Sequence, residues 1–343
     1  MRRLTSIAYN RILLASAALI LALASCGTQP ISAPTATVPV PSATTVPQPS
    51  ATSTPPAPTV AATATPVATT LLPTAIPAAP TAVPTVSQSA AVQTILAYYN
   101  NINQKEYEAS YRLWANNGAA SGQTLAQFTA GFTQTVQVDI QLGEPTAAAD
   151  SAVTVPLTIL SVVNTPGSTT GQTIEQYQGT YMLVPNTGGW HITSAQIAAS
   201  SGTLPPATLA TPESALQGYY AAIDQHALAQ AFTYWSGNGQ ASQQTFEQFA
   251  TGYAHTASAT IALGKGQGQG AAGSVYTDIP SVVHATTSDG SQQTFCGTYT
   301  LRRSNVPPFD KLGWHIEGAK IAAHAYVAPG SPEEQQLLVN GCS

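Results

Sequence analysis

Charged residues are scarce in this sequence, which has ten Lys or Arg and fifteen Asp or Glu among 343 residues. Three of the ten basic residues, Arg2, Arg3 and Arg11, lie in the first eleven positions, which leaves seven for the rest of the chain. No run of Lys and Arg occurs there. The sequence therefore argues against nucleic acid as a partner and against electrostatic attachment to anionic lipid.

Long apolar runs are also missing. Residues 12–24 are apolar over only about a dozen positions, whereas a membrane-spanning helix needs about 20. This run follows the three arginines, as in a secretory signal, and ends in Leu23-Ala24-Ser25-Cys26, which resembles the lipobox of bacterial lipoproteins. The resemblance implies that residues 1–25 are a signal peptide and that Cys26 carries the lipid. A secretory signal with a chance cysteine is the alternative.

A lipid on Cys26 would make the membrane a partner of the chain. Acyl chains such as palmitate contribute about 0.8 kcal/mol per buried CH₂. The predicted location is therefore the extracytoplasmic face of the cell membrane.

Cysteine is rare, with only three in the chain. Lipidation of Cys26 leaves Cys296 and Cys342, and in an oxidising exported compartment such a pair is expected to form a disulfide. Two free thiols are the alternative. Neither cysteine belongs to a C-x-x-C pair, which argues against redox catalysis.

Residues 27–88 lack both charged and aromatic side chains and consist largely of Pro, Thr, Ala, Val and Ser. Without large apolar groups, nothing offsets the entropy of folding, and proline favours extended backbone. We expect residues 26–88 to be a disordered tether, with a reach of up to about 190 Å at about 3.1 Å per residue. Its composition also fits an O-glycosylated stalk.

An internal repeat divides the remaining chain. Tyr98-Tyr99 recurs as Tyr219-Tyr220, an offset of 121 residues that is shared by Gly118 and Gly239 and by several further matches. A period this long predicts two tandem domains rather than a solenoid. The predicted ranges are 89–200 for the first repeat, 201–211 for a linker, 212–326 for the second repeat and 327–343 for a C-terminal tail.

The hydrophobic period changes once within each repeat. Apolar residues recur at three- and four-residue steps over 92–102, which predicts a helix, and two further helices are expected near 107–114 and 125–132. In the second repeat, Thr211-Pro212-Glu213 predicts a helix start. From Val136 the period becomes two, and four strands are expected. Helices followed by an antiparallel sheet make an α+β domain.

Three helices before a curved four-stranded antiparallel sheet, with Tyr-Tyr on the first helix and Gly-Trp-x-Ile at the last strand, resemble the NTF2-like (cystatin-like cone) superfamily. The resemblance covers about 110 residues, twice, and implies a conical pocket between helices and sheet. If a pocket exists, eight aromatic residues are its expected lining, although aromatic residues more often form the core. They are Tyr98, Tyr99, Trp114, Trp190, Tyr219, Tyr220, Trp235 and Trp314.

Catalytic motifs are not recognisable. Residues 268–273 formally match G-x-G-x-x-G, but they lie between predicted strands with no helix following, so a flexible hairpin loop is expected. Five of six histidines fall in the second repeat without metal-ligand spacing, and they are expected on the surface; strand alternation turns His315 outward. The same alternation points Asp139 outward, and Asp278 and Asp139 have Thr158 and Thr260 as their counterparts. The sequence predicts no catalytic residue, metal or cofactor.

Three functions remain open. The favoured hypothesis is a non-catalytic, surface-displayed module that binds a small molecule or a cell-envelope protein. An isomerase- or dehydratase-type enzyme with its active site in one cone is the first alternative, and it requires a buried carboxylate with a raised pKa. A structural spacer or assembly subunit is the second.

Overall fold

The computed structural model describes residues 84–342, all of which belong to one compact unit. The predictions for the signal peptide, Cys26 and most of the tether lie outside the described residues. Among the residues described, no helix is long and apolar enough to cross a membrane.

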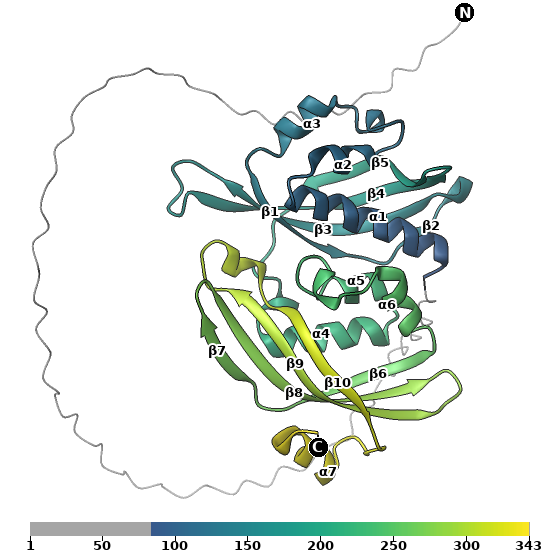
Figure 1. Cartoon of the computed structure of the whole chain (residues 1–343), viewed down its shortest axis with the longest axis vertical. Helices are drawn as coiled ribbons and strands as arrows, with labels where there is room; N and C mark the ends of the chain where they lie inside the picture. The colour runs from purple at the N-terminus through teal and green to yellow at the C-terminus, as the bar shows by residue number, and fades with distance from the viewer. Residues whose placement is uncertain (1–83, 343) are drawn as a thin grey trace, which may run out of the picture. The chain divides into compact units, whose positions relative to one another are not determined.

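The first repeat places its helices before its strands, as predicted (Figure 1). Its elements are α1 (Val86–Asn103), α2 (Tyr107–Arg112), α3 (Leu125–Gly131), β1 (Thr135–Leu142), β2 (Thr146–Ala147), β3 (Val153–Asn164), β4 (Gln172–Asn186) and β5 (Gly189–Ala199). The antiparallel sheet has the order β1-β3-β4-β5, and β2 pairs with β3. Strand β1 is therefore an edge strand.

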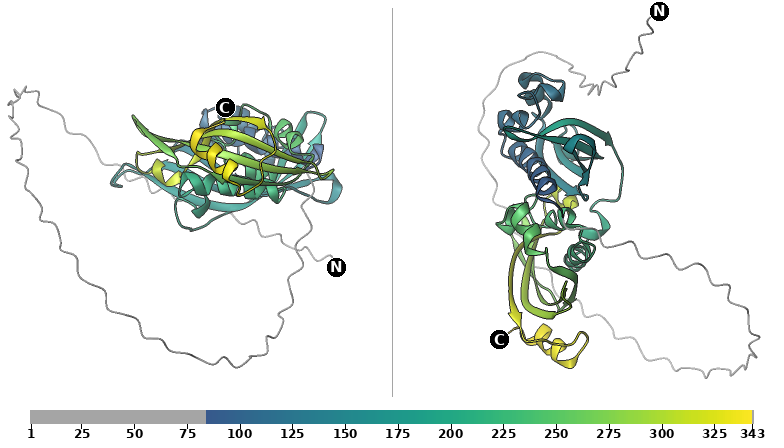
Figure 2. Two further views of the ribbon diagram at one scale, coloured as in Figure 1. Left: turned by 90° about the horizontal axis from the view of Figure 1, so that it is seen from below. Right: turned by 90° about the vertical axis from the view of Figure 1, so that its right-hand side faces the viewer.

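The second repeat has the same order of helices and strands, with a short helix added between its last two strands and a further helix at its C-terminal end. Its elements are η3 (Ala207–Leu209) in the linker, α4 (Pro212–Asp224), α5 (Leu228–Phe232), α6 (Phe246–Gly252), β6 (Thr256–Leu263), β7 (Gln267–Ala271), β8 (Ser274–Thr287), β9 (Gln292–Ser304), η5 (Phe309–Leu312), β10 (His315–His324) and α7 (Pro332–Asn340). The sheet order is β10-β9-β8-β6, with β7 paired to β8, and the sheet curves around α4 (Figure 2).

The α+β class is confirmed, and each repeat has the helix and strand order that the NTF2-like resemblance implies. Three details of the prediction are wrong. Each sheet has five strands rather than four. The additional strands, β2 and β7, were not predicted because their short sequences carry no hydrophobic alternation. Residues 267–271 pair with β8 as a strand, so this segment is part of a hairpin arm rather than a flexible loop. Trp114 lies just beyond the second helix and bridges to Ile192.

Helix starts follow one rule in both repeats. Thr85, Thr124, Thr211 and Thr245 each occupy the N-cap of a capping box, in which the threonine hydroxyl accepts from the backbone three residues on. Such a cap is worth about 1 kcal/mol. The predicted start at Thr211 is confirmed.

The outer face of each sheet is covered by a segment that has no counterpart in the first repeat's sequence. Leu160 and Val162 of β3 pack with Leu312 of η5, with Phe309 and Leu204 beside them. In the second repeat this role falls to α7. Its Leu338 packs on Val282 and Cys296.

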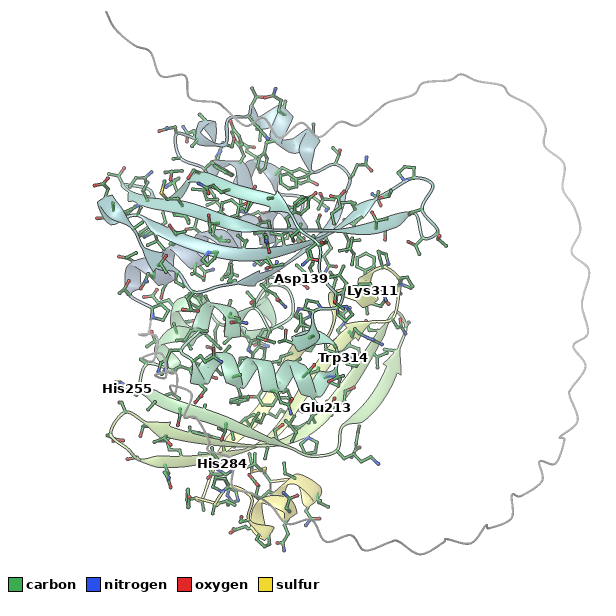
Figure 3. The ribbon with its side chains drawn as sticks, turned by 180° about the vertical axis from the view of Figure 1, so that it is seen from behind. Asp139, Glu213, His255, His284, Lys311 and Trp314 are labelled. Carbon is green, nitrogen blue, oxygen red and sulfur yellow. A yellow bond between two sulfur atoms is a disulfide. The ribbon has the colours of Figure 1, made fainter. Side chains whose placement is uncertain are left out.

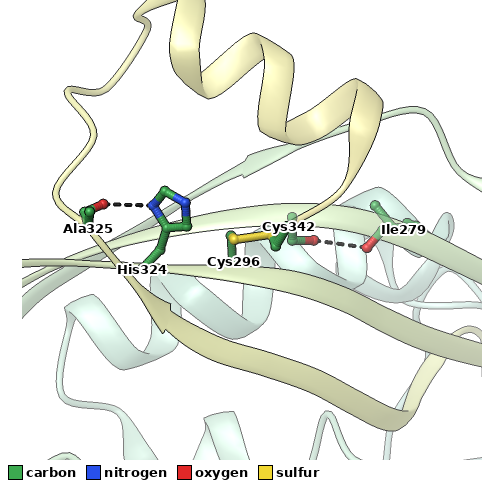
Figure 4. The surroundings of a disulfide bond; sticks show 6 residues. Ile279, Cys296, His324, Ala325 and Cys342 are labelled. Carbon is green, nitrogen blue, oxygen red and sulfur yellow. Dashed lines mark hydrogen bonds between the residues drawn. A yellow bond between two sulfur atoms is a disulfide. The ribbon is translucent and has the colours of Figure 1, made fainter.

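Helix α7 is held on the second sheet by one covalent and one polar link. The disulfide between Cys296 and Cys342 is present as predicted, and its cysteines are 46 positions apart in the sequence (Figure 4). His284 Nε2 on β8 also lies 2.6 Å from Glu334 Oε1, and both side chains are largely buried.

Loss of the disulfide should loosen this helix. In the chain-entropy model, a loop of this length contributes about 4 kcal/mol. The Cys296→Ala/Cys342→Ala protein is therefore expected to melt about 10 °C lower in calorimetry. Cys26→Ala is the matched control and should leave the melting temperature unchanged. A double variant that melts with the parent would show that the disulfide does not stabilise the fold.

Candidate functional site

Most of the aromatic residues named as possible pocket lining contact one another in the core of their repeat, which is the more common role expected from the sequence. Tyr98 and Tyr99 have ring centroids 4.9 Å apart in an edge-to-face arrangement, and the Tyr99 hydroxyl lies 2.8 Å from that of Tyr181. The second repeat repeats this with Tyr220 and Tyr299, whose hydroxyls are 2.6 Å apart. Six of the eight are buried, namely Tyr98, Tyr99, Trp114, Tyr219, Tyr220 and Trp314, whereas Trp190 and Trp235 are half-buried.

Burial raises the pKa of Tyr98, Tyr99, Tyr219 and Tyr220 well above that of a free phenol, so these side chains stay neutral at physiological pH. None of the eight predicted residues lines either cavity described below. They act as the core of each cone.

The candidate site lies where side chains of the second repeat contact the free edge of β1. Asn238, which is 3% exposed, presents its amide to this edge. Its Oδ1 accepts from the Ile140 N–H at 3.0 Å, and its Nδ2 donates to the Val138 carbonyl at 3.3 Å. Further along, the Leu142 N–H donates to Thr233 Oγ1 at 3.4 Å. The side chains of the second repeat thus replace a neighbouring strand.

Two further side chains cross the junction in the opposite direction. Gln93 Oε1 accepts from the Phe246 N–H at the start of α6 at 3.0 Å, and Glu144 Oε1 accepts from the Ala229 N–H at 2.8 Å. Burial raises the pKa of Glu144 to about 7, while its backbone hydrogen bonds lower it. These contacts make the junction a specific interface with hydrogen bonds at both ends.

A cavity of about 130 Å³ opens beside this junction and is lined by both repeats. Its lining comprises Gln137, Asp139, Ser236, Gly237, Arg302, Arg303, Ser304, Phe309, Leu312, Gly313 and His315. The first repeat contributes residues of β1, and the second contributes the ends of β9 and β10 together with η5. Figure 3 shows Asp139 close to the η5 segment that carries Lys311.

Asp139 and His315 meet in this cavity, which corrects two predictions. Both were expected to face solvent, but the Asp139 side chain is 13% exposed and that of His315 is 9% exposed. Asp139 Oδ2 lies 3.3 Å from His315 Nε2, although the geometry is not that of a hydrogen bond, and Nε2 has no hydrogen-bond partner. Burial raises the pKa of Asp139, and the nearby His315 lowers it. Strand alternation does point each of these side chains away from the core of its own repeat. Each then meets the other repeat rather than solvent.

Two arginines add positive charge to the same cavity. The Arg303 guanidinium lies 5.3 Å from the Trp314 ring centroid in a cation–π contact, and its buried Nε has no partner. Arg302 Nε donates to Ser274 Oγ at 3.1 Å. Within residues 84–342, no carboxylate forms an ion pair with either arginine.

The other histidines and Asp278 lie elsewhere. His226 Nε2 bonds the Thr256 carbonyl at 2.9 Å, and His284 pairs with Glu334, so these two are not the surface side chains expected. His255 is exposed as predicted. Asp278 accepts from the Thr300 hydroxyl at 2.6 Å. Over the described part of the chain, no three His, Cys, Asp or Glu residues cluster as metal ligands would.

The sequence interpretation missed Asn238, Glu144 and Arg303. One signal was available: Asn238-Gly239 recurs at the repeat offset as Asn117-Gly118, and both asparagines have a positive φ, of 54° and 53°. The shared turn could be recognised from this pair. Its contact with the first repeat could not, because only one of the two copies makes it.

No protein-family model and no curated protein matches the chain. Among solved structures, one chain described as "Ntf2 like protein involved in plasmid conjugation" is 9% identical. The alignment covers 69% of this chain and 96% of that chain, with a TM-score of 0.21. A score this low carries no argument about fold or function, so the fold rests on the topology given above.

Replacing Asn238 tests the junction against a matched control in the same turn. Asn238→Ala leaves the buried Ile140 N–H without a partner, which costs about 2 kcal/mol. Asn117→Ala introduces alanine at the same positive φ but breaks no hydrogen bond. In urea denaturation, the free energy of unfolding of the Asn238→Ala protein should therefore be about 2 kcal/mol lower than that of the Asn117→Ala protein. Equal losses would mean that the amide contacts add nothing beyond backbone strain.

Proposed function

We propose that this chain is a lipid-anchored, non-catalytic binding module displayed on the extracytoplasmic face of the membrane, and that its ligand is a small oxyanion held in the junction cavity. The observation that carries the proposal is the Arg303 guanidinium, which borders a cavity shared by both repeats and has no carboxylate partner in the described chain. Arginine offers a fork of donors that matches carboxylate and phosphate oxygens.

Charge and hydrogen bonding in the cavity support an anion. His315 Nε2 and Arg303 Nε are buried nitrogens without partners, and leaving such groups unsatisfied costs free energy that a bound oxygen would recover. Asp139 is the only acid in the lining, and burial favours its neutral form by raising its pKa. The lining therefore offers more donors than acceptors.

Size limits the ligand further. A cavity of about 130 Å³ is close to the roughly 150 Å³ that holds a benzene molecule in an engineered protein core. An anion of about six non-hydrogen atoms fits this space, such as a short carboxylate, a hydroxycarboxylate or inorganic phosphate. A nucleotide or a peptide does not fit inside it.

An enzyme is the second candidate, and one observation favours it. Asp139 and His315 lie side by side in a cavity, and such a pair can serve as a general acid and base. For an enzyme of this kind we propose an active site at the junction rather than in a cone. The two candidates differ in whether a bound anion is turned over, which one-dimensional NMR of the ligand over several hours resolves.

Ligand binding is tested by calorimetry on the full-length protein at constant ionic strength. Acetate, glycolate and inorganic phosphate are titrated separately, and we expect at least one to bind at one site per chain. Arg303→Gln should weaken binding at least about tenfold, or about 1.4 kcal/mol. Lys320→Gln is the matched control, because Lys320 is an exposed cation on the same sheet.

Melting curves without ligand show whether Arg303→Gln is folded, and the NMR signal of His315 gives a second measurement on the parent protein. The proposal predicts that this signal moves when the anion is added. Absence of saturable binding by all three anions up to about 50 mM would remove the oxyanion assignment.

Membrane anchoring is tested at the N-terminus. Mass spectrometry of the exported protein is expected to give an N-terminal peptide that begins at Cys26 and carries acyl chains. Cys26→Ala should give an unprocessed, unmodified chain, because the thiol is the site of lipid attachment. Ser25→Ala keeps a small residue before the cysteine and should be processed as the parent is. An unmodified Cys26 in the exported protein would refute the anchor.

A further inference from the structure

The surface that the second repeat buries at the junction has an open counterpart in the first repeat. Asn238 and Asn117 occupy the same turn at the repeat offset of 121. Asn238 is buried against β1, whereas Asn117 is exposed. Asn117 therefore holds the same conformation without the contact that its counterpart makes.

The residues around this turn show the same contrast. Phe246 at the start of α6 is fully buried, whereas its counterpart Leu125 at the start of α3 is 37% exposed. Ala229 is fully buried, and its counterpart Glu108 is exposed. The open surface forms a hollow of about 340 Å³ lined by Glu108, Tyr111, Arg112, Asn117 and Leu125. We call these five residues the free donor face.

The receiving side also has an open counterpart. Strand β6 is an edge strand, as β1 is, with Ile261 and Leu263 at the positions of Ile140 and Leu142. Their counterparts in β1 are buried and capped by the second repeat, but Ile261 and Leu263 are half-buried. In the described residues, no side chain accepts from the N–H of Ile261 or Leu263. The N–H of Ala259, in contrast, is capped by Asp224, just as that of Val138 is capped by Asn103.

One pair of charged positions is complementary between the two open faces, and its acid, Glu108, also pairs with Arg112 four residues along its own helix. Within the chain, Glu144 of the receiving side contacts Ala229 of the donor side. At the repeat offset these positions hold Lys265 and Glu108, both of which are exposed. A second copy that docks in the same way would bring Glu108 to Lys265, so that an ion pair takes the place of the hydrogen bond.

We propose that the chain associates with a second copy of itself, head to tail, by repeating its own internal junction. The free donor face of one copy docks on the β6 edge of the next, and Asn117 supplies the amide contacts that Asn238 makes within the chain. The two docking surfaces are different, so the assembly is heterologous and extends as a filament unless its rotation closes a ring.

The contact between copies is weaker than the internal junction for two reasons. Gln93, Leu96 and Asn100 share the face of α1 that meets the second repeat, and on α4 an exposed Gln217 replaces the buried Leu96. Arg112 also stands at the position of Thr233, so it has no oxygen to accept from Leu263. The association is therefore reversible and depends on concentration and salt.

Sedimentation velocity of the full-length protein over a range of concentrations tests the proposal. The weight-average sedimentation coefficient should rise with concentration and fall with added salt. Asn117→Ala, Glu108→Lys and Lys265→Glu should each raise the dissociation constant at least about tenfold. Glu108 and Lys265 are exposed, so their variants should melt close to the parent, and Lys320→Gln should associate as the parent does. Asn117→Ala places alanine at a positive φ and should cost about 1 kcal/mol in backbone strain without unfolding the protein.

Mixing the two charge variants separates this geometry from other modes of association. An equimolar mixture of Glu108→Lys and Lys265→Glu contains both an original and a reversed ion pair across the junction, so association should return. A parent protein that stays monomeric at the highest concentration would overturn the proposal, as would association that the three variants leave unchanged. Anion binding in the junction cavity is measured separately, so failure of either proposal leaves the other intact.

Discussion

The side-chain amide of Asn238 meets a requirement that every open sheet imposes, which is that the backbone groups of an edge strand need partners. Ile140 is fully buried, so an unpaired N–H at this position would be costly. Because Asn238 follows Trp235, which bridges to Ile316 on β10, the capping turn and β10 are fixed together. This linkage brings His315 to Asp139 and places Arg303 beside the first repeat. The polar cavity is thus a consequence of how one edge strand is capped.

The two repeats are similar in chain path but unequal in environment. The turn with a positive-φ asparagine, the capped helices and the tyrosine pairs occur twice, but only one copy of each junction surface is used within the chain. The inserted segments add a further difference between the repeats, because η5 covers the outer face of the first sheet and α7 covers that of the second. A duplicated fold has therefore yielded one internal interface and two unmatched faces.

Local sequence patterns predicted the helices and strands that bury one face in the core of their own repeat. They did not predict which side chains are buried by contact with the other repeat. The alternation of Val136 to Leu142 identified β1, and Thr211-Pro212 identified the start of α4, since both signals lie within a few residues. Strand β7 was missed because Gly and Gln carry no apolar period. Asp139 and His315 were correctly turned away from their own cores, but periodicity within one repeat carries no information about a neighbouring repeat. For the same reason Arg303 had no visible role.

The order of the repeats along the chain has a consequence for biosynthesis. The first repeat emerges before the second, and until then the N–H groups of Ile140 and Leu142 on β1 have no capping side chain, while Leu160 and Val162 lack the cover that η5 provides. A bare edge strand beside an apolar patch is prone to pair with other chains. The first repeat is therefore most exposed to aggregation in the interval before residues 233–312 have emerged to cap β1 and cover its sheet.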